Sequence, residues 1–166
     1  MAKTSLQDMR GLPDPLQGYK FDLILSNLPV GNALALKLRC RSTQISGMTL
    51  EDVTINAHGV DLRYAGRPIW DGNLPATFFE TRDMAVRDNV RALMEFCRNM
   101  RTNTGEYKEN YEFIADVVLY DDRNNIVRVV RHFGAFFKQL DSPATSGDST
   151  PIEYSTGLSY DYHVDL

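Results

Sequence analysis

Residues 152–164 read IEYSTGLSYDYHV, and they alternate between two kinds of side chain along their whole length. The first series is mainly apolar: Ile152, Tyr154, Thr156, Leu158, Tyr160, Tyr162 and Val164. The second series is polar or small: Glu153, Ser155, Gly157, Ser159, Asp161 and His163. Successive side chains of a strand point to opposite faces, so the pattern predicts one long β-strand with a buried face and a wet face. Its length of roughly 43 Å would be about twice that of a usual strand and favours a large curved sheet or barrel wall.

The composition is that of one globular domain. The chain has 166 residues, of which 43% are hydrophobic and 24% are charged, and this suits a single domain with its own core. The formal net charge of -4, from 18 basic and 22 acidic side chains, argues against a basic nucleic-acid-binding protein. The charge is uneven, because no Lys or Arg follows Lys138 while acidic residues continue to Asp165.

The N-terminal segment differs in composition from the rest of the chain. Residues 1–18 contain two glycines and two prolines and are expected to form a mobile N-terminal arm, followed by a single domain over residues 19–166. No signal-peptide core or membrane-spanning stretch is visible, which predicts synthesis in a cytoplasm and no membrane partner. Cys40 and Cys97 are expected to be free thiols, with one disulfide as the alternative.

Most of the remaining chain reads as strands. Alternating residues predict strands over 19–25 and 34–43, which we expect to pair as a hairpin around the turn at 27–32. A weaker, polar hairpin is expected over 49–67, then a loop over 68–75 and a short strand within 74–81. Strands over 112–120 and 126–133 are joined by the acid-rich turn 121–125. Residues 141–151 are expected to form a polar loop before the final strand.

One segment has a helical period. Over residues 83–100 the apolar side chains recur at intervals of three and four, which predicts an amphipathic helix lying on the sheet, with Asp83 as its N-cap. These apolar residues are Val86, Val90, Leu93, Met94, Cys97 and Met100. The predicted fold class is therefore mainly β: a β-barrel or sandwich of about seven strands with one amphipathic α-helix packed on it.

No motif for catalysis, cofactor binding or metal binding is present. The three histidines, His58, His132 and His163, lie far apart and in no metal-ligand spacing, and neither a nucleophile motif nor a glycine-rich phosphate loop occurs. We therefore predict no catalytic residues, no cofactor site and no metal site, and we expect a protein that is not an enzyme.

The order of these elements resembles the tail tube proteins of contractile-tailed bacteriophages, which are related in fold to the tubes of pyocin-like particles and of type VI secretion. The resemblance covers about residues 19–164. It is carried by element order and by four short segments: residues 39–47 (RCRSTQISG), 77–80 (TFFE) running into 93–96 (LMEF), 133–136 (FGAF) and 156–162 (TGLSYDY).

The resemblance implies a structural virion protein of the tail that forms the inner tail tube as stacked homohexameric rings. It implies self-association as the main interaction, with the tail sheath, tape-measure, baseplate and tail terminator proteins as further partners. Genomic DNA would pass through the tube during ejection without specific binding. The alternatives are a tube subunit of a pyocin-like or type VI contractile injection particle, or a monomeric β-sandwich binding module.

Two surfaces are candidates for such an assembly. A conduit for DNA should carry few basic groups, because each phosphate neutralised by Lys or Arg strengthens binding. The base-free face of the final strand therefore supplies candidates for a lumen or ring interface, namely Glu153, Ser155, Ser159 and Asp161. The polar hairpin supplies candidates for contacts between rings, namely Asp52, Thr54, Asn56, His58, Asp61 and Arg63. Unpaired strand edges would join neighbouring subunits.

Overall fold

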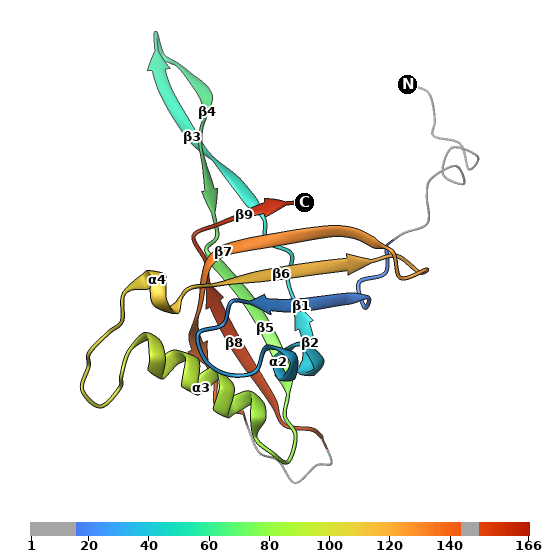
Figure 1. Ribbon diagram of the computed structural model, residues 1–166. Helices are drawn as coiled ribbons and strands as arrows, with labels where there is room; N and C mark the ends of the chain where they lie inside the picture. Colours follow the sequence, from blue (N-terminus) through green and yellow to red (C-terminus); the bar gives the residue numbers. More distant parts are fainter. Residues whose placement is uncertain (1–15, 144–149) are drawn as a thin grey trace.

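The computed structural model describes residues 16–143 and 150–166, which form nine strands and three helices (Figure 1). Their order is β1 (Phe21–Ser26), α2 (Ala33–Arg39), β2 (Cys40–Thr43), β3 (Met48–Ala57), β4 (Val60–Trp70), β5 (Asn73–Phe79), α3 (Ala85–Cys97), α4 (Lys108–Tyr111), β6 (Phe113–Tyr120), β7 (Ile126–Leu140), β8 (Glu153–Ser159) and β9 (Tyr162–Asp165). The prediction of a mainly β fold is confirmed. Most of the predicted N-terminal arm, and residues 144–149 of the predicted loop, lie outside the described residues.

The long strand β7 belongs to two sheet layers. Seven strands form one antiparallel sheet in the order β1-β6-β7-β8-β5-β2, and β9 also pairs with β7. The first part of β7, with β1, β6 and β9, forms a layer that we call layer A. Residues 136–140 of β7, with β8, β5 and β2, form layer B. Figure 1 shows the strands of layer A running across β5 and β8, an arrangement in which a strand that changes layer makes the corner.

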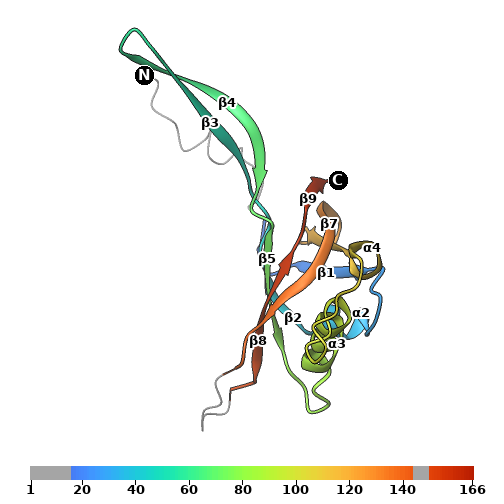
Figure 2. The same ribbon diagram turned by 90° about the vertical axis from the view of Figure 1, so that its left-hand side faces the viewer.

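The core lies between the two layers and under α3. The inward side chains of β1, β5, β6 and β8 meet three side chains of α3, Val86, Val90 and Leu93, which are fully buried as the helical period predicts. Met100 follows the helix and is exposed. Figure 2 shows α2 and α3 on the same side of β5 and β8. None of the helices in the described part of the chain is long and apolar enough to cross a membrane.

The predicted strand over residues 34–43 is wrong for its first half. Residues 33–39 form α2, and the strand β2 starts only at Cys40. Asn32 caps the helix, because its side-chain oxygen accepts a hydrogen bond from the Ala35 amide at 3.1 Å. Residues 33–39, ALALKLR, are also strong helix formers. Because these residues are helical, they do not pair with β1, which pairs with β6 instead, and the expected hairpin does not form. Leu36 is the buried residue of this helix.

The predicted single strand over residues 152–164 is broken in the middle. β8 and β9 are separated at Tyr160 and Asp161, although both pair with β7 along its length. The buried face is correct in β8 and just beyond it, where Tyr154, Thr156, Leu158 and Tyr160 are buried. After the bend Tyr162 and Val164 are exposed, contrary to the prediction.

The helix predicted over residues 83–100 is shorter and is capped differently. α3 is preceded by Met84, whose φ of 52° is left-handed, so Asp83 is not the N-cap residue. The Glu80 carboxylate instead accepts hydrogen bonds from the Val86 and Arg87 amides at 3.2 and 2.9 Å. Two of the amides that a helix start leaves unpaired are thereby satisfied from the end of β5.

Candidate assembly surfaces

One face of layer B is polar and is turned away from the helices. In the β5–β8 pairing, Asn73, Pro75, Thr77 and Phe79 lie opposite Ser159, Gly157, Ser155 and Glu153. Residues paired in this way share a face, and the alternate pairs, such as Leu74 with Leu158, are buried. In Figure 2 no helix or strand of the described residues covers the opposite side of β5 and β8. We call this surface the open face; it brings together three of the predicted lumen candidates, Glu153, Ser155 and Ser159.

The open face contains basic groups, although the final strand itself contains no Lys or Arg. Arg41 of β2 forms an ion pair with Glu153 across layer B. Lys138 of β7 is exposed and lies close to Gly157, because a Cβ built on Gly157 would be 3.4 Å from the Lys138 Cε. The absence of basic groups therefore holds for the final strand alone, since the neighbouring strands supply the positive charges that β8 lacks.

Asp161, the fourth lumen candidate, is not part of that run of residues. It lies at the bend after β8, where its carboxylate pairs with the Lys108 ammonium group of α4. Its backbone amide donates to the Phe133 carbonyl of β7 at 2.9 Å. The structure thus assigns Asp161 to a corner of the fold and leaves three of the four candidates on the open face.

Both lateral edges of layer B lack a neighbouring strand within residues 16–143 and 150–166. β2 pairs only with β5, and residues 136–140 of β7 pair only with β8. All neighbours in the layer are antiparallel, so β2 and β7 at its two ends run in opposite directions. A second copy placed side by side could therefore continue the same antiparallel pairing from β2 to β7.

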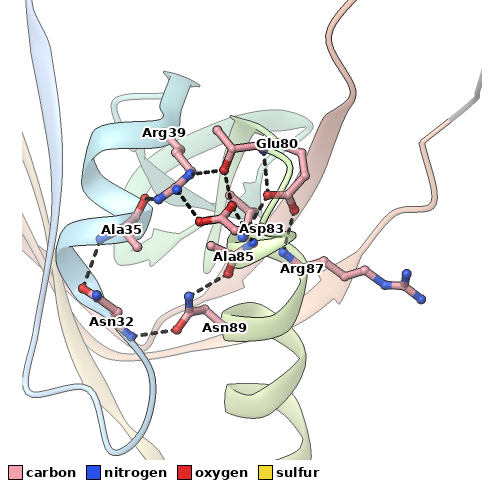
Figure 3. Close-up of polar contacts among 10 residues, drawn as sticks. Asn32, Ala35, Arg39, Glu80, Asp83, Ala85, Arg87 and Asn89 are labelled. Carbon is pink, nitrogen blue, oxygen red and sulfur yellow. Dashed lines mark hydrogen bonds and ion pairs between the residues drawn. The ribbon is translucent and has the colours of Figure 1, made fainter.

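A polar network fixes the position of the β2 edge (Figure 3). Arg39, the last residue of α2, donates to the Thr81 hydroxyl and to the Asp83 carboxylate, each at 3.0 Å. At the other end of α2, the Asn32 amide donates to the Asn89 side-chain oxygen of α3 at 2.7 Å. α2 is thus held at both ends against α3 and the β5–α3 connection, and β2 begins at the next residue.

The β3–β4 hairpin projects far from the rest of the chain (Figures 1 and 2). The hairpin itself was predicted from the sequence; the structure shows that it forms a separate two-stranded sheet and that nearly all of its residues are exposed. Five of the six predicted inter-ring residues lie on one face of its outer half, and the sixth, His58, is in the turn. On the polar face the Arg63 guanidinium group pairs with the Asp52 carboxylate at 3.2 Å. The Asn56 side-chain amide donates a hydrogen bond to the Asp61 carboxylate at 2.8 Å.

The opposite face of the hairpin is apolar, whereas the sequence analysis described the hairpin as polar and named no surface on this side. It consists of Val53, Ile55, Ala57, Val60, Leu62 and Tyr64, which pair across the two strands. The five largest of these side chains are between 43% and 60% exposed. The alternation within residues 53–57 and 60–64 could have revealed this face. An isolated two-stranded hairpin is at best marginally stable in water, so a face of this kind indicates a contact surface.

The remaining polar groups give no sign of a chemical site. In the part of the chain that the structure describes, no three His, Cys, Asp or Glu side chains are grouped to hold a metal ion. Cys40 and Cys97 are both free thiols. Burial, reinforced by the charge of Asp22, raises the pKa of Cys40 to about 12, so this thiol is protonated and unreactive at neutral pH.

Comparisons with known proteins find this arrangement in tube assemblies. No protein-family model matches the sequence, and no match is found among curated proteins. Among solved structures, a chain of the sheath-tube complex of the extracellular contractile injection system PVC, in the extended state, is similar over 99% of both chains, with a TM-score of 0.66 and 14% identity.

Two further structures widen the comparison. A chain of the anti-feeding prophage cap, described as a tube terminating cap, is similar over 94% of this chain and 93% of its own, with a TM-score of 0.67 and 13% identity. The SPP1 tail tube is similar over 91% of this chain and 78% of its own, with a TM-score of 0.51 and 11% identity. At such identities the likeness shows the fold, and this chain has the tube-forming fold found in contractile injection particles and in the SPP1 tail tube.

Proposed function

We propose that this protein is the tube-forming subunit of a contractile injection particle, with a structural and not a catalytic role. The observation that carries the proposal is the likeness of the whole chain to a chain of the PVC sheath-tube complex, over 99% of both. The open face, the two unpaired edges of layer B and the two-faced hairpin support it, because together they give a single subunit the surfaces that a tube needs.

Ring closure would use the edges of layer B. Joining β2 of one copy to residues 136–140 of β7 in the next is a head-to-tail contact, which forms a ring when the rotation closes. The joined layers would form one continuous antiparallel wall with its open face toward the bore. We propose homohexameric rings, in which Glu153, Ser155 and Ser159 line the bore together with the Arg41–Glu153 ion pair.

Stacking of rings would use the hairpin. Its apolar face would dock on a subunit of the adjacent ring, and its polar residues would stay at the rim of that contact. Complete burial of a Val, Ile or Leu side chain contributes about 1.5–3 kcal/mol. Val53, Ile55, Val60 and Leu62 are between 43% and 60% exposed, so burial of their remaining surface would contribute roughly half of this value for each side chain.

The test is electron microscopy of the purified full chain at rising concentration, with two double variants of the hairpin. We expect rings or hollow rods from the wild type. Ile55→Ser with Leu62→Ser should leave the thermal unfolding of the body unchanged but abolish rods. The matched control, Ile55→Val with Leu62→Met, keeps the face apolar and should form rods. A monomer at all concentrations would contradict the proposal and favour the β-sandwich binding module.

A bacteriophage tail tube is the second candidate. The likeness to the SPP1 tail tube favours it, although the TM-score of 0.51 is lower than the 0.66 for the PVC chain. The sheath, a terminator, a baseplate and a tape-measure protein would be partners in either particle, whereas DNA in transit belongs to the phage tail. Purified particles that carry this subunit distinguish the two, because only a phage tail is attached to a capsid containing nuclease-protected DNA.

A further inference from the structure

A group of buried polar side chains lies where the β3–β4 hairpin joins the rest of the chain. We call this junction, residues 44–47 before β3 and 71–72 after β4, the hairpin root. His132 of β7 is completely buried. Its Nδ1 atom lies 2.9 Å from the backbone carbonyl oxygen of Ala115 in β6, and its Nε2 atom lies 2.7 Å from the Ser46 hydroxyl oxygen. Ser46 belongs to the linker that leads from β2 into the hairpin, so a hydrogen bond to a core histidine fastens the first leg of the hairpin.

The partners of His132 define the tautomer of its neutral ring. A carbonyl oxygen can only accept a hydrogen bond, so Nδ1 carries the proton and donates to Ala115. In the neutral ring Nε2 is then the acceptor, and the Ser46 hydroxyl donates to it. Protonation would reverse this bond, because Nε2 would then donate and the Ser46 hydroxyl would have to accept. Both nitrogen atoms of the neutral ring are satisfied, and the complete burial of the ring favours this uncharged form.

The second leg of the hairpin is fastened at the same place. The Gly72 carbonyl accepts hydrogen bonds from the Tyr160 amide and from the Ser159 hydroxyl, both at 3.3 Å. The Tyr160 ring meets the His132 ring edge-on, with a distance of 4.7 Å between centroids. The linker before β3 and the linker after β4 are therefore both held by contacts that lead to His132. A change in the protonation of His132 would affect both linkers.

The surroundings of His132 do not provide for a positive charge. From β9, the His163 ring lies 5.7 Å away. The carboxylates that act on His132 are already paired with arginines: Asp116 with Arg131 through two hydrogen bonds of 2.9 Å, and Asp165 with Arg128 at 3.3 Å. The Tyr160 hydroxyl and the His163 Nδ1 atom are buried and have no hydrogen-bond partner among the described residues.

Burial is the main cause that lowers the pKa of His132 below the ordinary value of 6.5, and His163 adds to the effect. The Ala115 carbonyl and the two acids oppose it but do not reverse the direction. An exposed histidine takes up a proton near pH 6.5, whereas the closed form of the root takes it up only at lower pH. Between these two pKa values the open form binds more protons, so acid favours opening.

We propose that the contact between His132 and Ser46 is a proton-sensitive fastening that holds the hairpin root closed at neutral pH and lets it open on mild acidification. The inference uses contacts within one subunit only, so it does not depend on the proposed tube. Its consequence is that the orientation of the hairpin, and with it the presentation of the apolar face, varies with pH while the body stays folded.

The test is hydrogen–deuterium exchange of the soluble full chain at pH 7.5 and pH 5.5, corrected for the intrinsic dependence of exchange on pH. In the wild type, we expect the protection of segments 44–50 and 68–74 to fall at pH 5.5 by up to about tenfold, because an exposed histidine with the ordinary pKa of 6.5 is protonated about ten to one at that pH. Segment 113–119 of β6 should keep its protection. Ser46→Ala should show weak protection of the root at both pH values, and the matched control Ser42→Ala, on exposed β2, should behave like the wild type.

The histidine variants identify the group that responds. His132→Gln keeps one donor and one acceptor but cannot titrate, so its root protection should not change between the two pH values. His58→Asn, in the exposed turn, should keep the full response. If His132→Gln does not fold, the titration of the histidine ring signals in the wild type replaces it, and the His132 ring should titrate with a pKa below the ordinary value for histidine. Equal root protection of the wild type at both pH values would overturn the proposal, as would a response abolished by His58→Asn.

Discussion

Gly134 and Asp161 meet at the corner where two neighbouring strands bend together. The φ of Gly134 is 65°, in the left-handed region, and a side chain added there would collide with the Asp161 carboxylate. The same carboxylate pairs with Lys108 of α4. The corner of β7 therefore depends on a missing Cβ in one strand and on an acid in the next.

Gly134→Ala should consequently destabilise the fold. The left-handed backbone alone costs an L-residue of order 1–3 kcal/mol, and the collision adds to this. Gly157→Ala is the matched control, because its Cβ would make ordinary contacts of 3.4 Å and beyond. Urea unfolding measures both. The double variant Gly134→Ala with Asp161→Ala removes the collision and should be less unstable than the sum of the single variants. Equal stability of the two glycine variants would rule out this account of the corner.

The Glu80 carboxylate should matter more for stability than its position in a loop suggests. Glu80→Ala removes the acceptor for the Val86 and Arg87 amides and should cost about 0.5–2 kcal/mol, as the loss of a helix cap does. Glu80→Gln keeps one acceptor oxygen and should cost less. Glu95→Ala, which loses only an exposed pair with Arg91 on the same helix, should cost about 0.3–0.5 kcal/mol. Thermal unfolding followed by circular dichroism compares the three variants, and a cost for Glu95→Ala as large as that for Glu80→Ala would refute the assigned cap.

The Arg41–Glu153 ion pair should contribute little to the stability of one subunit. Both side chains are partly exposed, and pairs of this kind are worth about 0.2–1 kcal/mol. In a double-mutant cycle with Arg41→Ala and Glu153→Ala we expect a coupling energy in that range, which falls as salt is added. The exchanged pair, Arg41→Glu with Glu153→Arg, should restore the coupling. A coupling of several kcal/mol would show that the pair is buried in solution, for example by a neighbouring copy.

The Cys40 thiol should resist alkylation in the native protein. With a pKa of about 12, only about one thiol in ten thousand is ionised at pH 8, and the thiolate is the reactive form. In a Cys97→Ser variant, iodoacetamide should therefore modify Cys40 slowly before denaturation and rapidly after it. A native rate equal to the denatured rate would mean that the end of α2 does not shield this residue.

The parts of the fold that were predicted correctly from sequence depend on local periodicity. The spacing of Val86, Val90 and Leu93 places them on one helical stripe, and the alternation of Tyr154, Thr156 and Leu158 places them on one strand face. These patterns need no knowledge of the neighbours. The segment of α2 was ambiguous for the same reason, since apolar residues at 34, 36 and 38 satisfy a strand period over a length too short to test a helical one.

The parts that were missed depend on contacts between distant segments. Arg41 reaches Glu153 only because β5 lies between β2 and β8, an order that no local pattern contains. The bend that divides β8 from β9 requires Gly134 and Lys108, which come from two other segments. The apolar face of the hairpin is different, because its alternation was present in the sequence and only its exposure to solvent required the structure.

The passage of β7 from one layer into the other has a mechanical consequence. A load applied to residues 136–140 reaches residues 126–135 through covalent bonds, without crossing any interface that could slip. The two layers therefore move together. A force along β7 is resisted by all of its hydrogen bonds to β6, β8 and β9 at the same time.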